Sequence, residues 1–238
     1  ISAIKDHGAI IHYSADEESN ADICSDTFLL MDTGAQYLSG TTDITRTFAL
    51  GEISPKMKEM YTAVLKGNLR LQNAIFTHGS RGENIDIIAR EPLYRLGYDF
   101  KHGTGHGVGC YLNVHEGPVS IRNKIFNDRD NSAELVPGMI VSNEPGVYIE
   151  GEYGIRLENL LEVVEKGDTD YAKFYGFKPL TLVVWDKNAI LLDQLSDEEK
   201  ELLNDYHLEI YNTLRDYLSS EEDEDVLDWL FDATRPIR

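Results

Sequence analysis

Short apolar runs, each ended or interrupted by a polar or acidic residue, constrain the fold of this chain more than any other feature. Most are too short for ordinary helices and are rich in β-branched and aromatic residues, which indicates strands. The runs lie at residues 9–13, 28–34, 44–50, 139–145, 154–163 and 179–185. Two helical patterns lie between them, so the sequence predicts a fold with both helices and strands.

The two helical patterns have recognisable ends. The first begins at Ser54, an N-cap residue followed by proline at the first helical position, and is expected to run to about Phe76. The second covers about residues 83–96 and ends before Gly97, and Pro92 is expected to kink or shorten it. Residues 120–137 show no periodicity and are predicted to be a polar excursion.

The C-terminal part changes character at a capping box in residues 196–199. An apolar stripe at helical spacing follows, and then a second short helix with an apolar face. The stripe consists of Leu203, Tyr206, Ile210, Leu214 and Tyr217, and the second helix carries Val226, Trp229 and Leu230. We therefore expect one domain whose main part covers residues 1–195, with residues 196–238 as its helical extension.

Composition excludes several classes of protein. The 238 residues carry a net charge of −20, which opposes nucleic-acid binding. No apolar run approaches the length of a membrane span, and the first residues lack the pattern of a signal peptide. The two cysteines are too few for a disulfide scaffold and favour a reducing compartment. The sequence begins without methionine, and we expect the true N-terminus to be missing.

Acidic side chains occur where the predicted strands begin or end. Asp32 closes one run and Asp43 opens the next, so a hairpin would bring the two carboxylates together. Glu144 ends a third run. Arg156 and Glu158 are two residues apart in a fourth, which predicts that they point to one face of a strand. Alone, an aspartate of this kind is as often a turn residue.

Four carboxylates that meet in a fold need positive charge, because buried carboxylates repel one another. One arginine does not balance them, whereas two divalent cations do and leave a bridging hydroxide as a nucleophile. His106, from the glycine-rich residues 102–118, adds one imidazole, and this ligand set suits Mn²⁺, Co²⁺, Fe²⁺ or Zn²⁺. In isolation, His115 beside Glu116 is more often a surface pair. The sequence has no H-E-x-x-H or G-x-S-x-G motif.

At these positions the chain resembles the metallopeptidases of the creatinase/aminopeptidase superfamily, which have the pita-bread fold. Within it, the cytosolic type of aminopeptidase P is most similar. The resemblance implies an α+β fold, with a curved, mostly antiparallel sheet covered by helices. The chain's relatives have further segments before residue 1, so we expect the N-terminal part of the domain to be missing. The motifs that carry it are MDTGAQYLSGTTDITRTF (31–48), HGTGHGVGCYLNVHEGP (102–118), SNEPGVY (142–148) and GIRLENLLEV (154–163).

The resemblance also implies a role for each residue of the site. Five side chains would bind two divalent metal ions, most readily Mn²⁺ among the metals named above. Asp43 and Glu158 would each bridge the two ions. Glu144 would also shuttle the proton, and His12 and His115 would flank the scissile bond. His102, Tyr148 and Arg156 would line the pocket for proline. The metal ligands implied are Asp32, Asp43, His106, Glu144 and Glu158.

The activity implied is hydrolysis of the N-terminal residue from peptides with proline at the second position, through a metal-bridging hydroxide. Prolidase and methionine aminopeptidase are the alternatives within the enzyme class. A metal-free protein-binding module of the same fold is the alternative from another class. The resemblance further implies a cytoplasmic protein, peptide substrates as partners and a homodimer.

Overall fold

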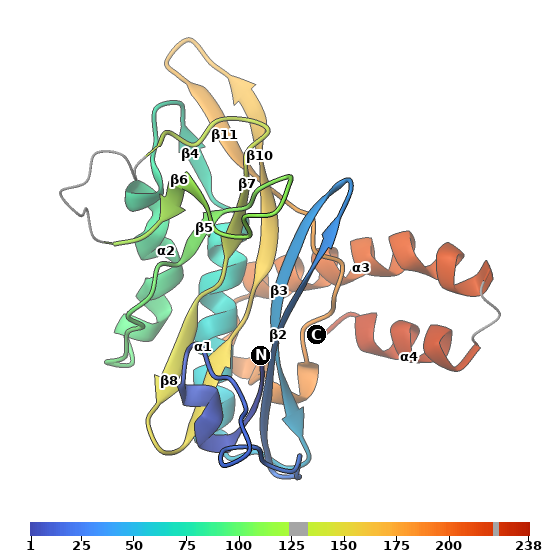
Figure 1. The fold of residues 1–238 in the computed structure, drawn as a ribbon. Coiled ribbons are helices and arrows are strands. Elements are labelled where there is room, and N and C mark those ends of the chain that lie inside the picture. The colour runs from blue at the N-terminus through green and yellow to red at the C-terminus, as the bar shows by residue number, and fades with distance from the viewer. Residues whose placement is uncertain (124–132, 221–223) are drawn as a thin grey trace.

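The computed structural model describes residues 1–123, 133–220 and 224–238, and in these it has the α+β organisation expected from the sequence (Figure 1). Four α-helices and eleven strands are present in the described residues. The helices are α1 (Pro55–Gln72), α2 (Gly82–Tyr94), α3 (Asp197–Ser220) and α4 (Glu224–Thr234). The strands are β1 (Ser2–Ile4), β2 (Thr27–Tyr37), β3 (Gly40–Leu50), β4 (Ile75–Thr77), β5 (Gly105–Gly107), β6 (Glu116–Ile121), β7 (Ile140–Asn143), β8 (Gly146–Ile149), β9 (Tyr153–Arg156), β10 (Asn159–Asp168) and β11 (Lys173–Pro179).

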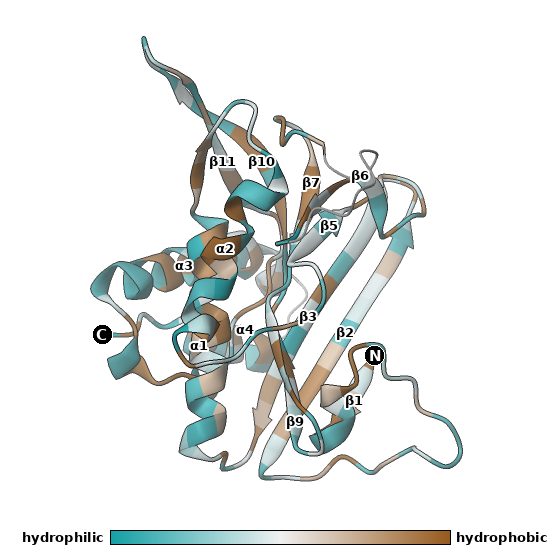
Figure 2. Ribbon diagram, turned by 90° about the vertical axis from the view of Figure 1, so that its left-hand side faces the viewer, coloured by the Kyte–Doolittle hydropathy of each residue, from teal (hydrophilic) through white to brown (hydrophobic). Residues whose placement is uncertain are grey.

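The strands form three groups, and all pairings within the described residues are antiparallel. The orders are β1-β2-β3, β4-β11-β10-β7-β5-β6 and β8-β9. Figure 2 shows α1, α2 and α3 on one side of the strands and the long β2–β3 hairpin on the other. The helices therefore cover one face, and the opposite side between the hairpin and the larger sheet is left for a site.

The β2–β3 hairpin confirms the pairing predicted from the two aspartates. Asp32 lies opposite Thr45, and Gly34 lies opposite Asp43. Asp32 and Asp43 are thus diagonal neighbours, two pairs apart on the same face of the hairpin, where side chains are within reach of each other. Both lie well inside strands of 11 residues rather than at strand ends.

Helix α1 forms the centre of the core, because apolar residues on different faces of it contact different layers. Tyr61, Leu65 and Leu69 pack with β8, β9 and the C-terminal helices, and Leu71 packs with α2 and the larger sheet. Its N-terminus is as predicted, since the Ser54 side chain accepts a hydrogen bond from the Met57 N–H. It ends at Gln72, earlier than expected, because residues 75–77 join the larger sheet as β4.

Helix α2 confirms the second helical prediction, and it continues past Pro92 to Tyr94. Of the predicted polar excursion over residues 120–137, residues 120 and 121 end β6, and residues 124–132 lie outside the described part. No helix among the described residues is long and apolar enough to cross a membrane.

Two predicted strands are wrong, and a third is divided. Residue 9 ends a 3₁₀ helix (Lys5–Ala9), and the residues after it form a turn rather than a strand. Residues 180–185 belong to no strand: only the Leu180 N–H bonds to a strand backbone, at the Leu160 carbonyl, and the Val183 carbonyl accepts from the side chains of Arg46 and Tyr206 instead. Residues 154–163 are two strands, β9 and β10, so Arg156 and Glu158 are not in one strand; both side chains nonetheless reach the same buried hydroxyl.

The two C-terminal helices confirm the predicted capping box and most of the predicted apolar stripe. Ser196 Oγ accepts from the Glu199 N–H, and the Glu199 carboxylate accepts from the Ser196 N–H. Leu203, Tyr206 and Ile210 are buried against α1, whereas Tyr217 is exposed. The division at residue 195 stays a prediction.

The buried His207 of α3 predicts an acid-sensitive step in stability. Its Nε2 accepts a hydrogen bond from the backbone N–H of Trp185 at 3.1 Å. Burial, with the charges of Lys187 and Arg46, lowers the pKa of His207 to about 3. Only the unfolded chain then gains a proton between about pH 6.5 and 3, so this residue's contribution falls by ~1.4 kcal/mol per pH unit as the pH drops. Urea unfolding of the wild type and His207→Gln at several pH values measures it. The stability advantage of the wild type should shrink over this window, and parallel profiles would contradict the assignment.

Candidate active site

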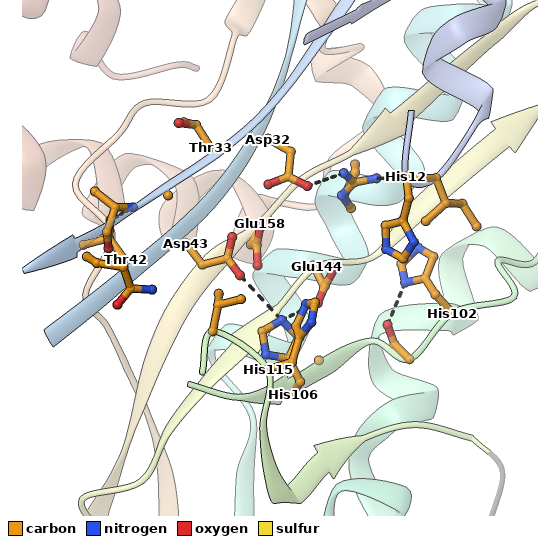
Figure 3. Close-up of a pocket in the computed structure, with 18 residues that line it drawn as sticks. His12, Asp32, Thr33, Thr42, Asp43, His102, His106, His115, Glu144 and Glu158 are labelled. Atoms are coloured by element: carbon orange, nitrogen blue, oxygen red, sulfur yellow. Dashed lines mark hydrogen bonds and ion pairs between the residues drawn. The ribbon is translucent and has the colours of Figure 1, made fainter. Parts of the chain in front are cut away.

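A cavity of about 610 Å³ lies between the hairpin, the glycine-rich segment and the ends of β7 and β9 (Figure 3). Nine of the ten residues predicted for the site line this cavity. The tenth, Tyr148, lies behind the wall, where its hydroxyl contacts His102 and Arg156. The residues lining the cavity are His12, Asp32, Asp43, His102, His106, His115, Glu144, Arg156 and Glu158.

The carboxylates converge around one imidazole. His106 Nε2 lies 3.2 Å from Glu144 Oε1 and 3.6 Å from Asp43 Oδ2. Three overlapping sets of three donor atoms each lie within 4.8 Å of one another. The sets are Asp32, Asp43 and Glu158; His106, Glu144 and Glu158; and Asp43, His106 and His115. Glu158 is common to the first two sets, which makes it the geometric link between two adjacent cation positions.

A single amide of α1 fixes the backbone beside two of these carboxylates. Asn68 is fully buried, and its Nδ2 donates to the carbonyls of Asn143 at 2.9 Å and Leu157 at 3.0 Å. These two residues immediately precede Glu144 and Glu158. Helix α1 thereby holds the ends of two separate segments at a set spacing.

The orientation of His106 leaves one ring nitrogen available. Its Nδ1 lies 2.9 Å from the carbonyl oxygen of Gly107, and because a carbonyl only accepts, Nδ1 carries the hydrogen. The lone pair of Nε2 in the neutral ring then faces the carboxylates. A hydrogen-bonded second nitrogen is the usual arrangement of a metal-binding histidine.

An oriented chain of hydrogen bonds forms another wall. His102 Nδ1 donates to the Gly103 carbonyl at 2.7 Å, so its Nε2 accepts from the Tyr148 hydroxyl at 2.8 Å. Arg156 donates to that hydroxyl at 3.1 Å and to Asp32 Oδ2 at 2.7 Å. Burial lowers the pKa of His102 and raises that of Tyr148 to about 12, so both stay neutral at pH 7.

The carboxylates strongly perturb one another. Burial, and then the charge of Asp32, raise the pKa of Asp43 to about 6. Burial raises the pKa of Glu158 well above its usual range, and the charges of Glu144 and Asp43 add to this effect. Burial acts in the same direction on Glu144, but in the metal-free chain the hydrogen bond and the charge of the protonated His106 ring, whose own pKa is raised, outweigh it, so the pKa of Glu144 is lowered.

These properties fit a pair of divalent ions. The protein itself provides one arginine against four carboxylates, and one oxygen of Glu158, Oε1, is buried without a partner in the described part of the chain. Such an oxygen is costly unless something binds it. Carboxylate oxygens with one imidazole are the donors that Mn²⁺, Fe²⁺, Co²⁺ and Zn²⁺ accept.

Two histidines lie at the open side of the cavity. His12 and His115 are exposed, and the His115 ring packs edge-on against His106 with ring centroids 4.3 Å apart. Burial, and next the neighbouring His106 ring, lower the pKa of His115, so it is neutral at pH 7. A neutral imidazole at this position can donate one hydrogen bond to a substrate.

Sequence reasoning missed three buried polar residues that orient the site: Thr45, Asn68 and Ser142. Ser142 Oγ donates to Glu144 Oε1 at 3.0 Å, and the hydroxyl of Thr45 donates to Glu158 Oε2 at 2.8 Å. A signal was available for Asn68, a polar residue on the apolar face of a helix. For the two hydroxyls the signal is weak, since serine and threonine are common in strands.

Comparison with known proteins decides the family. The model of metallopeptidase family M24 matches residues 1–165, and that of the C-terminal region of peptidase M24 matches residues 173–237. The chain belongs to metallopeptidase family M24. The M24 chain is 42% identical to aminopeptidase P1 of Arabidopsis thaliana over 241 residues, which span all of this chain and 36% of that protein. It is 42% identical to the probable Xaa-Pro aminopeptidase P of Metarhizium acridum over 243 residues, 38% of that protein.

Solved structures of M24 proteins confirm the predicted pita-bread fold. The X-prolyl aminopeptidase of Caenorhabditis elegans, described as a cytosolic enzyme with a di-nuclear active site, matches all of this chain and 38% of its own at 39% identity and a TM-score of 0.91. Prolidase from Pyrococcus furiosus matches 76% of this chain and 48% of its own at 32% identity and a TM-score of 0.62. This M24 chain spans about a third of the length of the curated relatives it matches.

Proposed function

We propose that the protein carrying this chain is a metal-dependent aminopeptidase that removes the N-terminal residue from peptides with proline at the second position. The observation that carries the proposal is the pair of overlapping donor sets that share Glu158, at the base of a cavity open to solvent. The names of the aminopeptidase P relatives and the complete match to the C. elegans enzyme support the substrate class.

Five side chains would hold two divalent ions, for which we propose Mn²⁺. Asp32 and Asp43 would bind the first ion, His106 and Glu144 the second, and Glu158 and Asp43 would bridge. When bound, such a pair polarises a carbonyl and lowers the pKa of a water molecule to near neutrality. The di-nuclear site of the C. elegans enzyme supports the number of ions.

The protein's own groups would move the proton and stabilise charge. Glu144 has a lowered pKa, so it is a carboxylate at pH 7 that can take the proton of the attacking water and pass it to the leaving nitrogen. His115, and His12 across the cavity opening, would donate hydrogen bonds where charge develops on the scissile carbonyl.

The wall formed by His102, Tyr148 and Arg156 would bind the penultimate proline. Each polar group of this wall already has a partner within it, so the face it presents does not require an amide N–H from the substrate. Proline is the residue that lacks this N–H. A pocket of this kind favours the ring over residues whose N–H would be left unpaired.

Three further points belong to the proposal. We propose residues 1–195 as the catalytic part and residues 196–238 as its extension. We propose a cytoplasmic protein, as the C. elegans enzyme is described as cytosolic. We also keep the homodimer as a proposal, which the resemblance supports.

Products from a mixed peptide panel test this function. The full natural protein, loaded with Mn²⁺, is given an Xaa-Pro-Yaa tripeptide, an Xaa-Pro dipeptide and a methionine-started peptide without proline, and products are identified by mass spectrometry. We expect release of the first residue mainly from the tripeptide, and a loss of about 10²- to 10⁴-fold in Glu144→Ala. Preference for the dipeptide would indicate a prolidase, and preference for the third peptide a methionine aminopeptidase. A protein that binds no metal and cleaves nothing would support the binding module.

A further inference from the structure

The hydroxyl of Thr45 lies between two charged groups of the site. Thr45 belongs to β3 and is fully buried. Its Oγ1 lies 2.8 Å from Oε2 of Glu158 and 3.2 Å from Nε of Arg156. No other residue in the described part of the chain bonds to this carboxylate through its side chain.

The direction of both hydrogen bonds is fixed by chemistry. An arginine only donates, so the Thr45 oxygen accepts from Arg156. The single hydrogen of the hydroxyl is then available for Glu158, whose carboxylate accepts it. The Thr45 hydroxyl therefore accepts a hydrogen bond from the Arg156 guanidinium and donates one to Oε2 of Glu158.

The other oxygen of Glu158 is left for a different partner. Oε1 is buried and has no hydrogen bond in the described residues, and it belongs to a side chain shared by two of the candidate cation sets. The backbone of Glu158 is fixed as well, since its N–H donates to the Thr45 carbonyl at 3.0 Å and its carbonyl accepts from Arg46. With the backbone and Oε2 both held, little freedom remains for Oε1.

We propose that Thr45 is a positioning residue that fixes the orientation of the Glu158 carboxylate and so leaves Oε1 available as a metal ligand, an inference that rests on the proposed function. Arg156 extends the same device, because its Nη2 binds Asp32 Oδ2 at 2.7 Å while its Nε binds Thr45. The Arg156 guanidinium and the Thr45 hydroxyl thus set the orientation of the Asp32 and Glu158 carboxylates relative to each other. Groups that orient metal ligands in this way commonly contribute about 10- to 100-fold to metal affinity.

The same strand offers a matched control in Thr47. It is also fully buried, and its hydroxyl also makes two hydrogen bonds, to the backbone carbonyl of Arg156 at 3.0 Å and from its N–H at 3.1 Å. Thr47 touches no carboxylate among the described residues. Thr45→Val and Thr47→Val therefore remove a hydroxyl of the same kind and burial, but only the first loosens Glu158.

The test measures Mn²⁺ binding to the full natural protein after removal of bound metal. Dissociation constants and the number of bound ions are determined by titration calorimetry for the wild type, Thr45→Val, Thr45→Ser and Thr47→Val, with the melting temperature of each metal-free protein alongside. We expect Thr45→Val to bind Mn²⁺ about 10- to 100-fold more weakly. Thr45→Ser keeps the hydroxyl and should bind as the wild type does, and so should Thr47→Val.

Two results would overturn the inference: wild-type affinity in Thr45→Val, or equal weakening in Thr47→Val, since the second is a general effect of unfolding the strand. If Thr45→Val does not fold, Thr45→Ala takes its place against Thr45→Ser, and wild-type affinity in the alanine variant overturns the inference equally. A wild type that binds no Mn²⁺ would instead contradict the proposed function, so the two failures are distinguishable.

Discussion

Replacing Asp43 by asparagine is expected to remove most of the activity while making the metal-free protein more stable. Asp43 belongs to two of the three donor sets, so its loss weakens both candidate cation positions. Several kcal/mol of metal-derived catalysis would be lost, and since ~1.4 kcal/mol is tenfold in rate, we expect kcat/KM to fall by about a thousandfold or more. Metal content after dialysis and peptide hydrolysis measure the first effect.

The gain in stability has a separate cause and a separate measurement. Burial and the charge of Asp32 already raise the pKa of Asp43 to about 6, so its ionised form is unfavourable in the folded, metal-free chain at pH 7. Asparagine has the same shape without the charge. Melting in excess chelator should therefore give a higher midpoint for Asp43→Asn than for the wild type. Asp168→Asn, at an exposed carboxylate of β10, serves as the control and should change neither quantity. Full metal content and activity in Asp43→Asn would contradict the site.

The substitution Gly154→Ala is expected to lower both stability and activity without removing metal. A Cβ at Gly154 would lie 1.7 Å from the backbone oxygen of Gly8, a distance that requires the backbone to move. Overpacking of this kind costs about 1–3 kcal/mol or more. The segment that must move leads directly to His12, at the opening of the cavity, so kcat/KM for the tripeptide should fall as well.

A matched variant lies on the other side of the same contact. A Cβ at Gly8 would lie 3.0 Å from the Gly154 nitrogen, so Gly8→Ala requires a much smaller shift and should have the weaker effect on both quantities. Melting temperature, kcat/KM and bound metal are measured for both variants. Equal effects of the two substitutions, or loss of metal in Gly154→Ala, would show that the close approach is not what positions this segment.

The sequence predicted the parts of the fold where local pattern and tertiary role agree. The hairpin that joins Asp32 to Asp43 follows from two apolar runs and the glycine-containing segment between them, and the N-terminus of α1 follows from Ser54 and Pro55. Residues 9–13 and 180–185 have the same apolar pattern but pack against side chains and turns instead of joining a ladder. Whether such a segment joins a sheet depends on residues far away in the sequence, such as Arg46, which donates a hydrogen bond to the carbonyl of Val183.

The site could be predicted to the level of its charged residues and no further. An ordered set of carboxylates and histidines is rare enough to mark a site, and the structure brings those side chains to one cavity. The residues that orient them are ordinary in composition. Thr45 differs from Thr47 only through strand register and the course of the chain 113 residues later, which no local pattern encodes.

The large separation in sequence between Asp43 and Glu158 has a consequence for folding. Asp43 and Glu158 meet only when β3 reaches the start of β10, so their repulsion is added to the local repulsion between Asp32 and Asp43 once these distant segments come together. Ions that bind only the finished arrangement transfer their binding free energy to the fold as a whole. The stability of this protein is therefore defined only at a stated concentration of free metal, and its folding and its metal supply form a single equilibrium.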